Sequence, residues 1–271
     1  MQGAGRRPGV ETASAGAGLM REVHVFDGLS ALHAAAAERI TVAASRSIAA
    51  RGRFLLVLAG GSTPLDVYAR LASRAVSRID WQRVDIFWGD ERCVPPDHDE
   101  SNYGNAAATL LRHVPIPLHR VHRIRGEQTP ARAAAEYDAA LASFFGAATP
   151  IDPEVGTTFD LVLLGMGADG HTASLFPGSP ALDASAWAAP AHAQAPASIA
   201  QRVTLTFPAI NASRECMFLV TGDAKRKAVA EVFRARTPTE EPRSLLPAGR
   251  VQPRERSLWF FDGAAAGALE M

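Results

Sequence analysis

The sequence predicts an α/β protein in which helices cover both faces of a doubly wound, mostly parallel sheet. Two observations support this prediction. Short stretches of strand length alternate along the chain with longer stretches of helical periodicity. Several of the short stretches, such as Phe54–Leu58, are apolar at every position, which is expected of strands that are buried on both faces.

The predicted elements follow one another in the order that this architecture needs. Helices are expected at residues 29–50, 64–75, 102–113, 131–145 and 224–234, and strands at residues 23–26, 54–58, 84–88, 120–124, 159–164, 203–207, 217–220 and 258–261. Residues 1–20, rich in Gly and Ala, are expected to form a flexible N-terminal extension, and residues 21–271 a single α/β domain. The Ala- and Pro-rich residues 181–200 are expected to be a long surface loop.

Length, composition and charge limit the classes of function. The chain has 271 residues, 47% of them hydrophobic, which is enough for a substantial core. Lys and Arg (28) balance Asp and Glu (28), so nothing in the composition suggests a nucleic-acid or membrane surface. The two cysteines have no metal-ligand spacing and form no disulfide framework, and no apolar run has the length of a membrane span. We therefore expect a cytoplasmic protein, and we expect it to be a monomer.

The most informative stretch follows the predicted strand at 159–164. Three glycines, Gly165, Gly167 and Gly170, form a turn that carries Asp169 and His171. Ligands of open α/β sheets bind beyond the carboxyl ends of the strands, so this acid–imidazole pair is a candidate catalytic group. The glycines also match the dinucleotide-binding pattern, but no long helix follows and no acid lies about 20 residues later, which argues against nicotinamide binding.

A second candidate site lies where the strand at 54–58 meets the next helix. Gly60, Gly61, Ser62 and Thr63 precede Pro64, which is expected at the first helical position, with Ser62 or Thr63 as the cap. Amides at a helix N-terminus bind anions, and glycines allow close approach. An ordinary strand–turn–helix junction would use the same residue types, so both interpretations stay open.

Charged residues at three further strand or helix ends complete the candidates. Asp90 and Arg92 follow the strand at 84–88, Arg202 begins the strand near 203–207, and Lys225 begins the helix near 224–234. A lysine near a helix N-terminus opposes the helix dipole, and a nearby anion would explain it. Each of these residues could also be an ordinary surface charge.

Taken together, the motifs resemble those of the 6-phosphogluconolactonases, within the sugar-phosphate isomerase and deaminase-like superfamily. The resemblance covers residues 22–268 and rests on five motifs in the same order: residues 60–64, residues 89–92 with 101–103, residues 165–178, residues 202–206, and Gly222 with Lys225. It implies a Rossmann-like fold and hydrolysis of 6-phospho-D-glucono-1,5-lactone, with no metal and no cofactor.

The resemblance also assigns roles to residues. It makes His171 the general base that activates water, supported by Asp169. It places the phosphate among Ser62, Thr63, Arg202 and Lys225, beside Gly60 and Gly61, and it places Asp90 and Arg92 around the sugar. Gly167 is a further candidate for binding the substrate. We further expect amides of the 165–170 turn to stabilise the developing oxyanion.

Two other functions stay open. Glucosamine-6-phosphate deaminases of the same superfamily carry an acid five positions after the equivalent histidine, where this chain has Phe176, so lactone hydrolysis is favoured over deamination or isomerisation. Related domains also serve as non-catalytic sugar-phosphate sensors, usually beside a DNA-binding segment. Residues 1–20 are too short and too rich in glycine for a helix-turn-helix.

Overall fold

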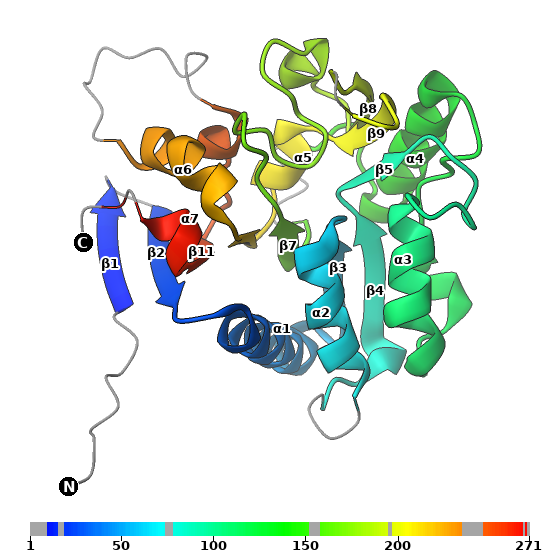
Figure 1. Cartoon of the computed structure of the whole chain (residues 1–271). Coiled ribbons are helices and arrows are strands. Elements are labelled where there is room, and N and C mark those ends of the chain that lie inside the picture. The colour runs from blue at the N-terminus through cyan, green and yellow to red at the C-terminus, as the bar shows by residue number, and fades with distance from the viewer. Residues whose placement is uncertain are drawn as a thin grey trace, which may run out of the picture.

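A computed structural model describes residues 10–15, 19–73, 78–151, 158–194, 197–234, 246–267 and 269 (Figure 1). The main sheet is built from eight strands: β1 (Val10–Ala15), β2 (Leu19–Phe26), β3 (Phe54–Leu58), β4 (Val84–Trp88), β6 (Val121–His122), β7 (Leu161–Leu164), β10 (Glu215–Val220) and β11 (Arg256–Asp262). Their order is β1-β2-β11-β10-β7-β3-β4-β6, and every neighbouring pair is parallel except β1 with β2.

Helices and a smaller sheet complete the fold. The helices are α1 (Leu29–Arg51), α2 (Ser62–Ala72), α3 (Asn102–Thr109), α4 (Pro130–Phe145), α5 (Phe207–Asn211), α6 (Arg226–Phe233) and α7 (Gly263–Ala266). The smaller sheet joins β5 (Asp90–Arg92), β9 (Gln201–Leu205) and β8 (Ala188–His192) as antiparallel neighbours. It lies beyond the end of β4, since only Gly89 separates β4 from β5 (Figure 1).

The strand order contains a reversal that locates the site. From β3 the chain moves outward to β4 and β6, then returns to place β7 on the other side of β3 and continues outward through β10 and β11. Ligands of doubly wound sheets bind at such a switch point, outside the carboxyl ends of the strands. Here the switch point lies between β3 and β7, where residues 56 and 57 pair with residues 161 and 162.

The core forms around the central strands. All residues of β3, β4, β7 and β10 are buried, so both faces of the sheet are covered, as the continuous apolar stretches predict. Trp259 of β11 stacks on Phe218 of β10 with ring centroids 3.7 Å apart. The predicted fold class, an α/β fold with a mostly parallel central sheet, is confirmed.

Three expectations about the chain's organisation need correction. The stretch at 203–207 belongs to the smaller antiparallel sheet as β9, because a short apolar stretch looks the same in either sheet. Residues 181–200 are not simply a surface loop, since they contain β8 and the fully buried Trp187. The Trp187 amide donates to Asp138 on α4 (2.7 Å), and its indole N–H donates to the Ala147 carbonyl (3.1 Å).

The N-terminal segment also differs from the expectation. Val10–Ala15 pairs with β2 in an antiparallel register, from Val10 opposite His24 to Ala15 opposite Leu19, where we expected an extension without regular structure. Residues 1–9 and 16–18 lie outside the described residues. This strand could not be predicted, because a Gly- and Ala-rich segment has no strand-like pattern of side chains.

Most other elements match within a few residues. The predicted helix at 102–113 ends at Thr109 and continues only as a short 3-10 turn (Leu111–His113), and the end of the predicted 64–75 helix reaches residues outside the described part. Of the helices described, none combines the length and apolarity that a bilayer crossing needs.

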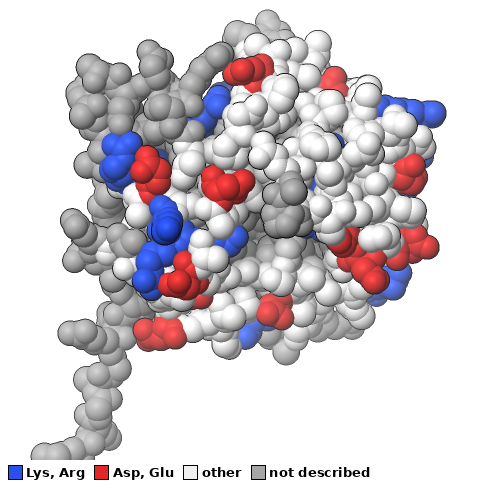
Figure 2. Space-filling model, turned by 45° about the horizontal axis from the view of Figure 1, so that its top comes forward, with Lys and Arg blue, Asp and Glu red and all other residues white. Residues whose placement is uncertain are grey.

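Positive and negative side chains are interspersed on the face drawn in Figure 2.

Candidate active site

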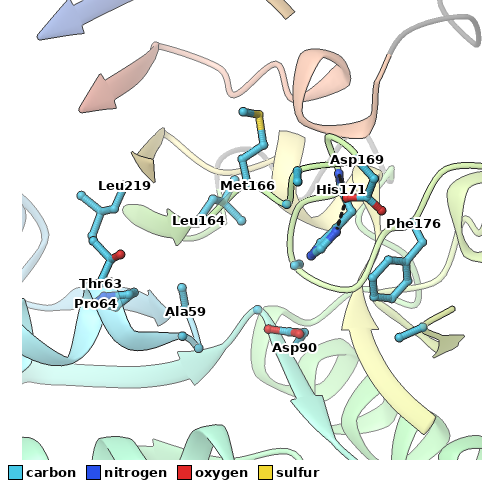
Figure 3. Close-up of a pocket in the computed structure, with 18 of the residues that line it drawn as sticks. Ala59, Thr63, Pro64, Asp90, Leu164, Met166, Asp169, His171, Phe176 and Leu219 are labelled. Atoms are coloured by element: carbon cyan, nitrogen blue, oxygen red, sulfur yellow. Dashed lines mark hydrogen bonds and ion pairs between the residues drawn. The ribbon is translucent and has the colours of Figure 1, made fainter. Parts of the chain in front are cut away.

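A cavity of about 810 Å³ opens at the carboxyl ends of β3, β4, β7 and β10. Figure 3 shows Thr63 and Pro64 on one side of it, His171 and Phe176 on the other, and Asp90 between them. Every residue that the sequence predicted for the site lines this cavity, namely Gly60, Gly61, Ser62, Thr63, Asp90, Arg92, Gly167, Asp169, His171, Arg202 and Lys225. The structure therefore brings the predicted residues together, whereas their individual roles stay proposals.

His171 and Asp169 are in direct contact. His171 Nδ1 lies 2.6 Å from Asp169 Oδ1, and the His171 backbone N–H donates to the same oxygen at 3.2 Å (Figure 3). Partial burial alone would raise the pKa of Asp169, but these hydrogen bonds and the nearby imidazole outweigh burial and hold that pKa below its usual value. The carboxylate orients the ring, so Nε2 is the nitrogen left to exchange a proton with a ligand.

The turn that carries this pair is closed by its own backbone. The Gly167 N–H donates to the His171 carbonyl at 2.9 Å, and the Gly170 N–H donates to the Gly167 carbonyl at 3.1 Å. These two amides are therefore engaged within the turn, so a role in stabilising an oxyanion stays a proposal for the other amides of residues 165–170. Gly170 has φ +79°, a conformation that favours glycine.

Phe176 lies against the imidazole. The ring centroids of His171 and Phe176 are 4.6 Å apart with a tilt of 49°, and Phe176 is buried. An apolar ring thus occupies the position where the resemblance leads us to expect an acid in a deaminase. This neighbour can pack on the histidine but cannot exchange a proton with it.

Cationic side chains gather on the β5–β9 side of the cavity. Arg92 on β5 and Arg202 on β9 are direct partners in the antiparallel register. Burial and the neighbouring Arg92 lower the pKa of Arg202, although Asp90 opposes the effect. Two arginines at paired strand positions that interact electrostatically favour an anion between or beside them.

Lys225 adds a third cation from a different element. It stands at the cap position of α6, after Thr221 and Gly222, and it lines the same cavity. Burial lowers the pKa of Lys225, while the nearby Asp169 acts in the opposite direction. Lys225 therefore interacts electrostatically with Asp169 of the His171–Asp169 pair.

The junction between β3 and α2 differs in detail from the expectation. The helix begins at Ser62 rather than Pro64, its cap is Gly61 with φ +97°, and no side chain caps it. The Thr63 hydroxyl instead lies 2.9 Å from the Thr221 hydroxyl. Because the first turn has no side-chain cap, a bound anion would satisfy its amides. The close approach of α3 requires Gly60, since a Cβ there would meet Asn102 Oδ1 at 2.0 Å.

Sequence reasoning missed several residues of the site. Thr221 directly follows β10, so the rule that polar residues gather at the carboxyl ends of strands could have found it. Ser174 and Asn102 both bond the Asp90 carboxylate, through Ser174 Oγ at 2.6 Å and Asn102 Nδ2 at 3.3 Å. Nothing in the sequence signals these two contacts, because they join segments far apart in the chain.

Comparison with known proteins agrees with this geometry. Residues 28–260 match the family described as glucosamine-6-phosphate isomerases/6-phosphogluconolactonase. The chain is 38% identical over 252 residues to a protein of Mycobacterium tuberculosis named 6-phosphogluconolactonase, covering 91% of this chain and 98% of that one. It is 35% identical over 254 residues to a protein of the same name from Nostoc, covering 93% and 100%.

A solved structure shares the fold as well. The crystal structure of 6-phosphogluconolactonase from Thermotoga maritima superposes with a TM-score of 0.73 at 30% sequence identity, and the match covers 89% of this chain and 98% of that one. The match to the family model spans most of the chain, and the motifs it contains are those that line the cavity. This chain belongs to the family of glucosamine-6-phosphate isomerases and 6-phosphogluconolactonases.

Proposed function

We propose that this protein hydrolyses 6-phospho-D-glucono-1,5-lactone to 6-phospho-D-gluconate, the second step of the oxidative pentose phosphate pathway. The observation that carries the proposal is the His171–Asp169 pair, joined at 2.6 Å in a cavity that also holds Arg92, Arg202 and Lys225. A base and an anion site in one cavity suit a phosphorylated substrate that is attacked by water. The names and coverage of the relatives support the same reaction.

The chemistry follows from the orientation of the imidazole. With Nδ1–H donated to Asp169, Nε2 of His171 takes a proton from a water molecule as its oxygen bonds to the lactone carbonyl carbon. The tetrahedral intermediate then breaks its bond to the ring oxygen. His171 returns the proton to that oxygen, which becomes the C5 hydroxyl, and the carbonyl carbon becomes a carboxylic acid that ionises. Asp169 stabilises the imidazolium between the two steps.

The remaining residues divide between the phosphate and the sugar. We assign the phosphate to Ser62, Thr63, Arg202 and Lys225, together with the backbone at Gly60 and Gly61. Their place around one cavity and the uncapped first turn of α2 support this assignment. We assign Arg92 to the sugar. Asp90 lies on the same wall of the cavity as Arg92, and Gly167 lies against the imidazole of His171.

Deamination or isomerisation of an amino-sugar phosphate is the second candidate, because the description of the matching family names glucosamine-6-phosphate isomerases beside 6-phosphogluconolactonase. The contact between Phe176 and His171 disfavours it. A ring that cannot exchange protons fills the place where such a reaction would need an acid. A non-catalytic sugar-phosphate sensor is the third candidate, and it would have no need of the Asp169–His171 contact.

A lactone-clearance assay separates the three candidates. Glucose-6-phosphate dehydrogenase generates the lactone in situ, and 6-phosphogluconate is followed with its own dehydrogenase against the uncatalysed rate. The proposal predicts strong acceleration of lactone clearance and no release of ammonia from glucosamine-6-phosphate. Release of ammonia without lactone clearance would favour the second candidate, and binding without turnover of either compound would favour the sensor.

Two further expectations complete the proposal. We propose that the protein acts as a monomer in the cytoplasm; its two free cysteines support a reducing compartment. Sedimentation at micromolar concentration tests the oligomeric state directly. A dimer with residues from both copies at the cavity would contradict the single-chain site described above.

A further inference from the structure

Ala173, two residues after His171, has an unusual backbone conformation. Its φ is +47°, and among the described residues no other non-glycine residue has a positive φ. The left-handed region is unfavourable for an L-residue because its Cβ comes too close to the following carbonyl oxygen. Such a conformation persists only where neighbouring contacts hold it in place. The turn after His171 is therefore held under strain by something around it.

Ala173 lies in a turn closed by the Leu175 N–H, which donates to the Thr172 carbonyl at 2.9 Å, and its two neighbours tie that turn to the rest of the fold. Thr172 and Ser174 are both fully buried. On one side, the Thr172 hydroxyl donates to the Gly165 carbonyl at 2.8 Å. On the other side, the Ser174 hydroxyl donates to Asp90 Oδ2 at 2.6 Å, and the Ser174 backbone N–H donates to the Thr204 hydroxyl at 3.2 Å. Ala173 is thus fixed between an anchor on its own turn and an anchor on the smaller sheet.

The Asp90 carboxylate is occupied by these protein contacts. One oxygen accepts from Ser174, and the other lies 3.3 Å from Asn102 Nδ2, whose amide group also donates to the Asp90 carbonyl at 2.9 Å. Asp90 is only 8% exposed. A hydrogen bond to a buried carboxylate is stronger than one between neutral groups, so this contact can offset the strain at Ala173.

We propose that Ser174 and Asp90 are a positioning pair for His171, and that their hydrogen bond holds Ala173 in its left-handed conformation so that the imidazole points into the cavity. This inference rests on the proposed hydrolysis and deepens it, because it assigns Asp90 to the support of the base rather than to direct contact with substrate. The pair acts through the backbone of residues 171–174 and touches no reacting atom.

The test compares four variants with the wild type in the lactone-clearance assay. Ser174→Ala is expected to lower kcat at least tenfold while KM changes less than threefold, because the base is displaced and the phosphate site is intact. Ser213→Ala is the matched control: Ser213 is also fully buried, bonds Cys216 at 3.4 Å, and lies before β10 at the far end of that strand. Its kcat is expected to stay within twofold of the wild type.

Ala173→Gly distinguishes positioning from general destabilisation. Glycine adopts a positive φ without the side-chain cost, so the double variant Ala173→Gly/Ser174→Ala is expected to regain at least a third of the lost kcat on a logarithmic scale. Ala173→Gly alone is expected to keep kcat within threefold. Because glycine at a positive φ can also stabilise the fold, the melting temperature is measured beside kcat. A loss of kcat in Ser174→Ala that persists well below its Tm reports displacement of the base, and a loss that appears only as the protein unfolds would overturn the positioning role.

A spectroscopic measurement keeps this inference separate from the proposed reaction. The Cα and Cβ chemical shifts of Ala173 report its backbone conformation whether or not the protein is active. They are expected to indicate the left-handed region in the wild type and to move away from it in Ser174→Ala. An unchanged shift or an unchanged kcat in Ser174→Ala would overturn the positioning pair. A wild type that clears no lactone would overturn the proposed function instead, and the chemical shifts would still decide the role of the pair.

Discussion

At the scale of single residues, Gly167 lies directly beneath the candidate base. A Cβ at this position would lie 2.1 Å from His171 Nδ1 and 2.4 Å from Asp169 Oδ1, closer than real contacts allow. Gly167→Ala must therefore displace the imidazole, and we expect kcat to fall at least a hundredfold, which is the usual cost of losing a well-placed general base. Steady-state kinetics with the phosphorylated lactone measures the change.

Gly28→Ala is the control for this variant, because a Cβ at Gly28 would meet no atom within 4 Å and the residue lies at the start of α1. Its kcat is expected to match that of the wild type. Normal turnover by a folded Gly167→Ala protein would contradict the assigned position of the base.

Arg202 offers a second test at the residue scale. If its guanidinium binds the phosphate, Arg202→Ala removes a charge-assisted hydrogen bond worth about 1.5–3 kcal/mol. We expect kcat/KM to fall about ten- to a hundredfold for the phosphorylated lactone and far less for unphosphorylated gluconolactone. Lys227→Ala, which removes an exposed cation on α6, should leave both values unchanged. Equal losses for the two lactones would place the phosphate elsewhere.

At the scale of elements, Glu91 joins β5 to the start of α3. Its carboxylate accepts from the backbone N–H groups of Asn102 and Tyr103, both at 2.7 Å, and from that of Arg92 at 2.8 Å. It is 2% exposed, and burial raises its pKa to about 7 even though these hydrogen bonds oppose the shift. The junction that places Arg92 in the cavity therefore contains a titratable group.

This pKa predicts a pH dependence of stability. The native state holds the Glu91 proton more tightly than the unfolded chain does, so this residue's contribution to the free energy of unfolding falls as pH rises from about 4.5 to 7. The limit is about 1.4 kcal/mol per pH unit. Glu91→Gln lacks this titration. The free energy of unfolding of the wild type minus that of the variant, measured by urea denaturation, should therefore decrease across that pH range. A difference that stays constant or grows with pH would contradict the prediction.

The elements also show how far sequence reasoning reaches. Strands β3 and β4 have their predicted bounds because continuous apolar stretches between polar turns have one simple interpretation. The short strands β5 and β8 were not predicted, since three charged residues or an Ala–Pro stretch carry no periodic signal. The pairing of β5 with β9 joins segments about a hundred residues apart, whereas β8 ends nine positions before β9 begins.

Some features of the site could likewise be predicted from the sequence, and others could not. Most of the lining residues could be predicted because they lie in turns that follow strands or at the start of a helix, where the fold collects ligand-binding groups. The cap of α2 and the partner of Asp90 could not be predicted. The first depends on the exact start of a helix, and the second on a side chain, Ser174, 84 positions away in the sequence.

At the scale of the whole molecule, the reversal of strand order between β3 and β7 creates the site. Loops from opposite halves of the sheet meet there, so the β3–α2 turn faces the turn that carries His171 across one cavity (Figure 3). The smaller sheet closes a third side with Arg92 and Arg202. In the proposed reaction, the substrate bridges these parts, with its phosphate on one side and its carbonyl carbon beside His171 on another.

The most direct test of this account is the turnover of His171→Ala, measured together with its affinity for 6-phosphogluconate by thermal shift. We predict that lactone clearance falls to the uncatalysed rate while the dissociation constant stays within about threefold of the wild type, because His171 acts on water and the phosphate is held elsewhere. Ligand binding stabilises the native state by mass action, so retained affinity appears as a retained rise in Tm. Wild-type turnover by the variant would show that His171 is not the base.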